Sequence, residues 1–255
     1  MKKYFVVADV HSFYDEMIDA LMHAGFEVNN PEHIVICCGD MMDRGNKSRE
    51  MLDFFYDLHK SDRAILIRGN HEDLFEEMIE RGIPLRHDES NGTVKTLANL
   101  QDVKLDPWDI EDWTYAFHNY DKRWDELRAA MVDYYETKHH VFVHGWIPSS
   151  VEDWRHASKL DWNSARWLNG MEEYMFRKSK VRGKQVVCGH WHCSYGHVRN
   201  EWRKSRKQER PNFRFLEFSD KKYFVPYEEK GLLAIDACTA FSGFCNCVVF
   251  TEEEI

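Results

Sequence analysis

The sequence has no long hydrophobic run, no linker rich in glycine, serine or proline, and no internal repeat. Only 6 of its 255 residues are proline, and none of these gathers into a spacer. The short apolar run at residues 4–8 ends at Asp9, which is too short for the core of a signal peptide or for a membrane span. A chain of this length can bury one large core. We therefore expect a single domain over residues 1–255, in the cytoplasm and without a membrane partner.

Positive charge is also scarce, because 34 lysines and arginines face 44 aspartates and glutamates, for a formal net charge of −10. Affinity for nucleic acid comes largely from neutralising phosphates with basic side chains. The composition therefore excludes a general nucleic-acid binder. One basic stretch at residues 203–210 is interpreted as a solvated loop, with contact to an anionic partner as the alternative.

The seven cysteines are odd in number and do not have the spacing of a disulfide framework. Cys37, Cys38 and Cys188 fall in apolar runs, where cysteine behaves as a small hydrophobic residue. Cys245 and Cys247 lie two apart near a predicted strand, so their side chains point to the same face. Packing is the favoured role of this pair, with metal binding or redox chemistry as the alternative.

Apolar runs alternate with helical spacing along the first third of the chain. Strands are predicted at residues 4–8, 33–38 and 63–67, and helices at residues 14–24, 47–59 and 72–80. This alternation predicts a mostly parallel sheet with helices on both faces. Later strands, which could form a second sheet packed on the first, are predicted at residues 140–143, 185–188, 213–218, 232–236 and 247–250.

The alternation breaks between residues 84 and 138, where Trp, Asp and Tyr are frequent. We interpret this stretch as a helical insertion beside the functional site, and a role as a lid stays open. Its tryptophans, Trp108, Trp113 and Trp124, fit packing of the insertion better than stacking on a nucleobase, which is the alternative. A second tryptophan-rich helical stretch is predicted at residues 151–176.

Five short motifs place polar side chains just after predicted strands. They are D-V-H at 9–11, G-D-M-M-D-R-G at 39–45, G-N-H-E at 69–72, H-G at 144–145 and G-H-W-H at 189–192. Ligands of parallel sheets bind beyond the carboxyl ends of the strands, so these motifs are expected to converge. Glycines 39, 69 and 189 each precede a candidate ligand, where the missing Cβ allows a sharp turn and a close backbone approach.

The donor set predicts a site for two metal ions. Asp9 and His11 can converge on one ion if the strand ends between them. Asp40 can bridge two ions about 3.5–4 Å apart with its two carboxylate oxygens. A mixed nitrogen and oxygen set favours Mn²⁺, Fe or Zn²⁺ over Ca²⁺ or an all-oxygen Mg²⁺ site. The remaining donors are one amide oxygen and two imidazoles, on Asn70, His144 and His190.

The five motifs, in this order, resemble those of the calcineurin-like metallophosphoesterase superfamily. Residues 39–45 and 69–72 match its phosphoprotein-phosphatase branch, which includes Ser/Thr protein phosphatases, phage-type protein phosphatases and bacterial diadenosine-tetraphosphate hydrolases. N-G-T at 91–93 with T-L at 96–97 also resembles bacterial members, and residues 233–236 resemble the closing strand. The resemblance implies an α/β fold with four α-β-β-α layers and a helical insertion at about 84–138.

The resemblance also implies how the metal ligands are divided. Asp9, His11 and His192 would bind the first metal, and Asp40 would bridge. The second metal would be bound by Asn70, His144 and His190. Two divalent metal ions are implied, with manganese as the expected metal and iron or zinc as alternatives.

The catalytic groups implied by the resemblance are one acid and two arginines. His71 would protonate the leaving group and Asp43 would orient it. Arg44 and Arg68 would hold phosphate oxygens while water attacks in line, without a covalent enzyme intermediate. Glu72 is interpreted as a hydrogen-bond acceptor behind the ligands rather than as a ligand. Arg166 and Arg182 are further candidates for binding phosphate.

The chain departs from the family pattern at Ser12, Trp146 and Trp191. Ser12 stands where glycine usually follows the first histidine, and Trp146 stands where a small residue usually follows His-Gly. Because every ligand position is filled, we expect the metal chemistry to be retained. Trp146 and Trp191 are expected to wall the substrate pocket.

Three functions follow from these observations. The first is a metal-dependent phosphatase acting on phosphoserine or phosphothreonine in proteins, which predicts an open, shallow groove. The alternative is hydrolysis of a nucleotide such as a diadenosine polyphosphate, which predicts an aromatic-walled pocket. A remote alternative is a non-catalytic binding scaffold, which predicts missing ligands or a missing acid, and here none is missing.

Overall fold

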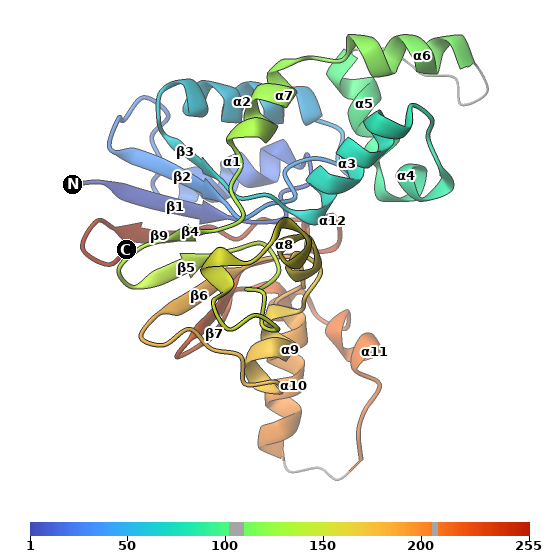
Figure 1. Ribbon diagram of the computed structural model, residues 1–255. Helices are drawn as coiled ribbons and strands as arrows, with labels where there is room; N and C mark the ends of the chain where they lie inside the picture. The colour runs from blue at the N-terminus through green and yellow to red at the C-terminus, as the bar shows by residue number, and fades with distance from the viewer. Residues whose placement is uncertain (102–109, 206–208) are drawn as a thin grey trace.

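The computed structural model describes residues 1–101, 110–205 and 209–255, and within these ranges the strands form two sheets (Figure 1). The first has the order β3-β2-β1-β9, with bounds Ala64–Leu66, His33–Cys37, Lys3–Val7 and Val248–Thr251. The second has the order β4-β5-β6-β8-β7, with bounds Tyr135–Glu136, His140–Phe142, Gln185–Cys188, Leu232–Ala234 and Tyr227–Glu229. Strands β1, β2 and β3 are parallel, as are β5, β6 and β8, so their carboxyl ends meet at one edge of each sheet.

Side-chain alternation along the strands explains the layers. In β1, Val6 packs in a cluster with Phe142 of β5 and Val187 of β6, which places this cluster between the two sheets. Phe5 and Val7 point the other way, toward α1 (Tyr14–His23) and α2 (Ser48–Lys60). The outer face of the second sheet is covered by α8 (Lys159–Ala165) and α9 (Gly170–Met175). The predicted four-layer α-β-β-α arrangement is confirmed.

In the described part of the expected insertion, four helices follow α3 (Asn70–Arg81). They are α4 (Arg86–Asn91), α5 (Thr93–Gln101), α6 (Ile110–Asn119) and α7 (Arg123–Ala130). Figure 1 shows α4, α5 and α6 extending beyond α3 at the helical side of the first sheet. Trp113 and Trp124 are buried in the core of this layer, which fits the packing role, while Trp108 lies outside the described residues. The last of these helices ends at Ala130, and β4 begins at Tyr135.

The last third holds one correction to the sequence prediction. Residues 213–218 were expected to form a strand, but they form α11 (Phe213–Glu217), which packs beside α10 (Ser194–Ser205). The Asn212 side chain accepts a hydrogen bond from the Phe215 N–H and so caps the helix. Phe213 and Glu217, four residues apart, are both buried, and this spacing belongs to a helix. The short β7 was not predicted.

Three short elements complete the described chain: α12 (Thr239–Ser242) and the 3₁₀ turns at Trp154–His156 and Lys221–Phe224. No helix in these ranges combines the length and apolar content needed to cross a membrane. All seven cysteines are free, and Cys245 and Cys247 both pack on the helical side of the first sheet. Of the basic stretch at 203–210, residues 206–208 lie outside the described ranges.

Trp146 lies in the core rather than at a pocket wall, so that expectation was wrong. Its side chain is only 1% exposed, packs in the cluster outside the second sheet, and donates its indole N–H to Ser179 Oγ at 3.0 Å. The loop lies close against the end of α8, since a Cβ on Gly145 would lie 2.5 Å from the Arg166 carbonyl oxygen, and a Cβ on Gly170 would lie 2.7 Å from the indole itself.

We predict that Trp146→Ala lowers the free energy of unfolding by about 3–5 kcal/mol, since it opens a large cavity in the core. Urea unfolding followed by circular dichroism measures this change. Trp167→Ala serves as the matched control, because Trp167 is 53% exposed, and we expect a loss below about 1 kcal/mol there. Similar losses in the two variants would contradict the core assignment.

Candidate active site

The backbone turns sharply where β1, β2 and β6 end. Asp9, His11, Asp40 and His190 have φ values of 52°, 45°, 54° and 65°. Residues other than glycine rarely adopt this left-handed region, at a cost of order 1–3 kcal/mol each, and such strain clusters at functional sites. The loops brace one another, since the Asp9 N–H donates to the Gly39 carbonyl at 3.1 Å and the His11 N–H to the Asp40 carbonyl at 3.0 Å.

Asp40 stands at the centre of two groups of side chains that could each hold a metal ion. The first group is His11, Asp40 and His71, and the second is Asp40, His144 and His190. Asp40 Oδ2 lies 3.6 Å from His11 Nε2, and Asp40 Oδ1 lies 3.4 Å from His144 Nε2. Two atoms that are each about 2.1 Å from one ion lie roughly 3.0–3.4 Å apart. The His144 distance lies within this range and the His11 distance slightly above it, while His71 Nε2 is farther from Asp40 Oδ2, at 3.9 Å.

The histidine tautomers test whether cations fit here. His11 Nδ1 lies 2.9 Å from the Met42 carbonyl and His144 Nδ1 lies 2.9 Å from the Cys38 carbonyl. A carbonyl only accepts, so Nδ1 carries the proton in each ring and Nε2 offers a bare lone pair. His11 Nε2 is buried without a hydrogen-bond partner in the described chain. An orphaned lone pair facing a carboxylate fits a bound cation.

Asn70 adds a second observation of the same kind. Its Oδ1 lies 2.8 Å from His144 Nε2, so an oxygen lone pair faces a nitrogen lone pair. The two lone pairs repel each other unless a cation lies between them and is bound by both atoms. Burial lowers the pKa of His144 from its ordinary value and that of His190 to about 3, which keeps both rings neutral and able to bind metal. The residues present therefore fit a metal ion at this position.

Asp40 has two further carboxylates near it, those of Asp9 and Asp236. Burial raises the pKa of Asp9 well above its ordinary value, and the nearby Asp236 and Asp40 carboxylates raise it further. Asp9 Oδ2 accepts one hydrogen bond, from the His190 backbone N–H at 2.8 Å. Asp236, which follows β8, was not predicted as a site residue, although it too is an aspartate at a strand end. Buried negative charge without enough basic partners also fits bound cations.

Asp40 itself is held in the charged form. Burial alone would raise its pKa, but the imidazoles of His144, His71 and His11 more than offset this and lower it below the ordinary value. Its Oδ1 accepts the His71 backbone N–H at 3.0 Å, at the first turn of α3. An ionised carboxylate with both oxygens turned toward imidazoles is suited to bridging two ions.

His71 and Asp43 form a buried pair beside the first group. His71 Nδ1 lies 2.7 Å from Asp43 Oδ2, and the hydroxyls of Thr93 and Thr96 donate to the same carboxylate at 2.9 and 2.7 Å. Burial lowers the pKa of His71, but the Asp40 charge and the hydrogen bond to Asp43 outweigh this and raise it. The two threonines belong to α5, so the insertion contributes directly to the site. In the sequence, the resemblance of N-G-T at 91–93 and T-L at 96–97 to bacterial family members already pointed to this segment.

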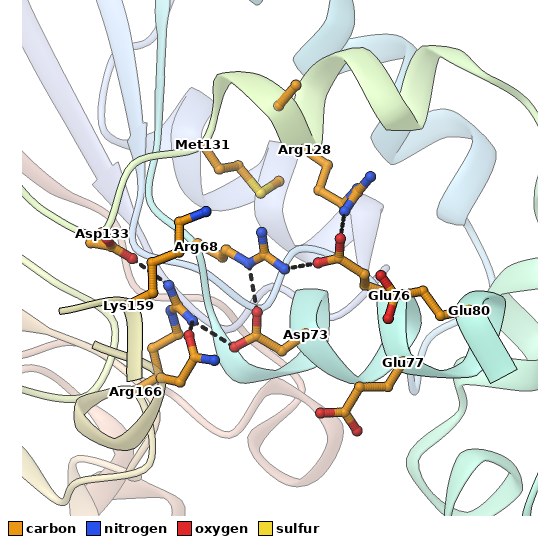
Figure 2. A pocket seen from close by; sticks show the side chains of 12 residues that line it. Arg68, Asp73, Glu76, Glu77, Glu80, Arg128, Met131, Asp133, Lys159 and Arg166 are labelled. Carbon is orange, nitrogen blue, oxygen red and sulfur yellow. Dashed lines mark hydrogen bonds and ion pairs between the residues drawn. The ribbon is translucent and has the colours of Figure 1, made fainter. Parts of the chain in front are cut away.

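Arg44 lies at the site, with Nη2 3.1 Å from His71 Nε2. Arg68 instead lies in a charged pocket between α3, α7 and α8, where Nε donates to Asp73 Oδ1 at 2.6 Å and Nη2 contacts Glu76 (Figure 2). Arg166 occupies the same pocket and pairs with Asp73. Both guanidinium groups are therefore engaged by carboxylates, and a phosphate-binding role for them stays a prediction. Arg182 lines a different pocket, near Lys184.

His192 is not in either group of candidate ligands found among the described residues. Its ring packs on Phe218 and Phe224, with centroids 5.6 and 6.0 Å away, so its assignment to the first metal stays a prediction. Glu72 behaves as expected for a residue behind the ligands. Its carboxylate accepts the backbone N–H groups of Gly69, Asp40 and Met41 at 2.7, 3.0 and 2.8 Å. Burial raises its pKa to about 7.

Gly189 has no room for a side chain, because a Cβ built there would overlap Asp9 Oδ2 and lie 2.8 Å from the Ala8 Cβ. We predict that Gly189→Ala weakens Mn²⁺ binding by about 10–100-fold, since Asp9 and His190 must move apart. Isothermal titration calorimetry of the metal-stripped protein measures this. Gly183→Ala is the control for backbone strain, because at φ 77° an alanine is strained there too, while its Cβ would enter open space away from the site. We expect it to lower stability and to leave Mn²⁺ affinity unchanged. Unchanged Mn²⁺ affinity in Gly189→Ala would contradict the role given to Asp9.

The four-layer fold and the His/Asp groups around Asp40 define this protein as a metal-dependent phosphoric ester hydrolase. The chain belongs to the calcineurin-like phosphoesterase family, whose sequence profile matches residues 2–194. The match includes all five motifs, which places the candidate ligands within the family domain.

Two proteins of Bacillus species are similar to part of the chain. The chain is 27% identical over 110 residues to bis(5'-nucleosyl)-tetraphosphatase PrpE [asymmetrical] of Bacillus subtilis, covering 40% of this chain and 43% of that protein. It is 34% identical over 74 residues to the protein of the same name from Bacillus velezensis, covering 27% of this chain and 30% of the relative. The chain therefore spans less than half the length of these curated relatives.

A solved structure described as a candidate diadenosine tetraphosphatase is similar over the whole chain. The TM-score is 0.53 with 12% sequence identity, covering 100% of this chain and 91% of that one. At this identity the likeness is one of fold.

Proposed function

We propose that this protein hydrolyses a phosphoanhydride bond of a nucleoside polyphosphate such as a bis(5'-nucleosyl) tetraphosphate. The observation that carries the hydrolytic part is the pair of candidate metal groups that share Asp40. The substrate class is supported by the relatives described as bis(5'-nucleosyl)-tetraphosphatases. In the overall reaction one water adds across a P–O–P bond. Its oxygen joins one phosphorus, and its two protons are shared between the two phosphates and the solvent.

The candidate ligands divide between two ions. Asp9, His11 and Asp40 would hold one, and Asp40 would share the second with Asn70, His144 and His190. Two divalent ions, with Mn²⁺, Fe or Zn²⁺ matching the donor set, would supply an activated water and neutralise charge on the phosphoryl oxygens.

The remaining groups handle the proton and the phosphate. Arg44 Nη2 donates to His71 Nε2 in the structure, so the proposed acid role requires Arg44 to turn to a substrate phosphate. A protonated His71 can then deliver a proton from Nε2 to the leaving oxygen, while Asp43 holds the Nδ1 side of the ring at 2.7 Å. Arg44, which lies next to His71 Nε2, can donate to a phosphate oxygen from the same side. Thr93 and Thr96 keep the Asp43 carboxylate turned toward His71.

A phosphoserine or phosphothreonine protein is the second candidate substrate. The buried His71–Asp43 pair favours it, since a general acid contributes most when the leaving group is a strongly basic alkoxide. A phosphate leaving group needs less help from an acid, so leaving-group dependence separates the two candidates.

The experiment compares three substrates on one preparation. Protein stripped of metal and restored with Mn²⁺ is assayed with diadenosine tetraphosphate, a phosphothreonine peptide and p-nitrophenyl phosphate. We expect the highest kcat/KM for the dinucleotide. A higher value for the peptide would favour the second candidate, and no Mn²⁺-dependent turnover of any substrate would overturn both.

A further inference from the structure

A pocket of about 700 Å³ opens directly beside His190. Three aromatic side chains help to form its wall: Trp167 after α8, Trp191 next to His190 in the chain, and Phe218 after α11. Both indole rings meet the His190 imidazole at a steep angle, with centroids 5.8 Å away for Trp167 and 6.4 Å away for Trp191. The pocket therefore adjoins the second group of candidate metal ligands.

Trp167 and Trp191 are the two exposed tryptophans among the side chains that the structure describes, and Phe218 beside them is exposed as well. Trp167, Trp191 and Phe218 are 53%, 40% and 38% exposed. Aromatic side chains of this size are mostly buried in folded proteins, and exposed ones gathered around a hollow mark a binding site. The contrast within the chain is sharp, because five other tryptophans are buried: Trp113, Trp124, Trp146, Trp154 and Trp162.

Charge in the pocket is also suited to a phosphorylated ligand. Arg214 lines the pocket and forms no ion pair within the described ranges, so its guanidinium is available to a phosphate oxygen. The other charged lining residues, Arg199 and Glu217, are paired with each other. One unpaired positive charge beside aromatic faces, in a protein with a net charge of −10, favours an anion that carries an aromatic ring.

The charged pocket around Arg68 does not offer this combination. Its lining includes four basic side chains, of Arg68, Arg128, Lys159 and Arg166, against five carboxylates, of Asp73, Glu76, Glu77, Glu80 and Asp133. Figure 2 shows the arginines turned toward Asp73, Glu76 and Asp133, and none of the described residues that line this pocket is aromatic. A polyphosphate would meet net negative charge there.

We propose that Trp167, Trp191 and Phe218 form the subsite for a nucleobase of the substrate, with Arg214 beside it as a contact for phosphate. The inference rests on the proposed nucleotide substrate and adds the residues that select it. The base stacks on an indole face while its 5'-phosphate chain reaches the ligands around Asp40. Stacking of a base on an aromatic side chain contributes about 1–3 kcal/mol, which corresponds to about 5–150-fold in affinity.

A binding measurement tests the subsite without turnover. AMP and ribose 5-phosphate carry the same phosphate and sugar, and only AMP carries a base. We expect the Mn²⁺-loaded protein to bind AMP at least about 5-fold more tightly in calorimetric titration. Trp167→Ala and Trp191→Ala should bring the two Kd values together, chiefly by weakening AMP. Trp202→Ala is the matched control, since Trp202 lines a neighbouring pocket instead.

Two outcomes would overturn the subsite. The first is equal affinity of the unaltered protein for AMP and ribose 5-phosphate. The second is an unchanged preference for AMP in both tryptophan variants. Failure of the proposed function is seen separately, as absence of dinucleotide hydrolysis by the unaltered protein.

A kinetic arm checks that the tryptophans act on the base rather than on His190. In Trp167→Ala and Trp191→Ala we expect KM for diadenosine tetraphosphate to rise about 5–150-fold, with little change in kcat. Inorganic tripolyphosphate, which has the same bond and no base, should keep its kcat/KM within about twofold. Equal losses on the two substrates would show that the indoles only position His190, and the subsite would be rejected.

Discussion

Replacing Asp40 by alanine is expected to remove at least one of the two metal ions and to slow hydrolysis severely. Asp40 is shared by the two candidate metal groups, and each of its oxygens faces a different imidazole. Two ions together contribute several kcal/mol to stabilising the transition state, so kcat/KM should fall by more than about 10³-fold. The metal content, measured by inductively coupled plasma mass spectrometry after dialysis, should fall from two ions per chain to one or none.

Asp88→Asn is the matched control for the loss of a buried carboxylate. Asp88 is 1% exposed in α4 and pairs with Arg81, away from the ligands. We expect this variant to keep both ions and its activity. Two retained ions in Asp40→Ala, with a circular dichroism spectrum like that of the unaltered protein, would contradict the bridging role.

Replacing His71 by alanine is expected to leave the metals in place and to slow turnover. If His71 is the general acid, the loss in kcat is about 10²–10⁴-fold for a poor leaving group. Phenyl phosphate and p-nitrophenyl phosphate differ chiefly in their leaving group, so kcat/KM for the two measures this role. We expect a larger loss on phenyl phosphate, because the less acidic phenol needs a proton more.

His71 also lies in the first group of candidate ligands, and the same variant separates the two roles. Loss of one ion from His71→Ala would make it a ligand and would contradict the acid assignment. Equal losses on the two aryl phosphates would do so as well. Thr96→Val, which removes one hydroxyl from the Asp43 carboxylate, should give a smaller loss of the same kind.

Much of the candidate site could be predicted because its residues follow strands. Four candidate ligands stand just past parallel strands: Asp9 and Asp40 in the first sheet, and His144 and His190 in the second. In each sheet the topology brings such positions to one edge. Their convergence thus depends on the pattern of the strands. The glycines before candidate ligands were also informative, since Gly69 and Gly189 leave no space for a Cβ.

Other residues could not be placed because their position depends on tertiary packing. His192 and His190 are two apart in the sequence, yet the first packs on phenyl rings while the second faces Asp40. Arg68 precedes the G-N-H-E motif, but carboxylates of α3 engage its guanidinium. Trp146 is buried because it packs against α8 and α9, whereas Trp167 is exposed, and the sequence did not separate the two.

The elements of the fold also differ in how well the sequence predicted them. The helices and strands of the first third were predicted to within a few residues, because apolar periodicity and buried faces agree there. In residues 213–218 the apolar positions match both a helix and a strand, and the cap by Asn212 decides for α11. This matters for function, since α11 carries Arg214 and leads into Phe218 at the wall of the aromatic pocket.

The most direct test of the central claim is a Mn²⁺ titration of metal-stripped protein in which bound ions and diadenosine tetraphosphate hydrolysis are followed together. The dinuclear site predicts saturation at two ions per chain, with hydrolysis absent at zero ions and rising as the second ion binds. Saturation at one ion, or full hydrolysis by protein that holds none, would contradict it.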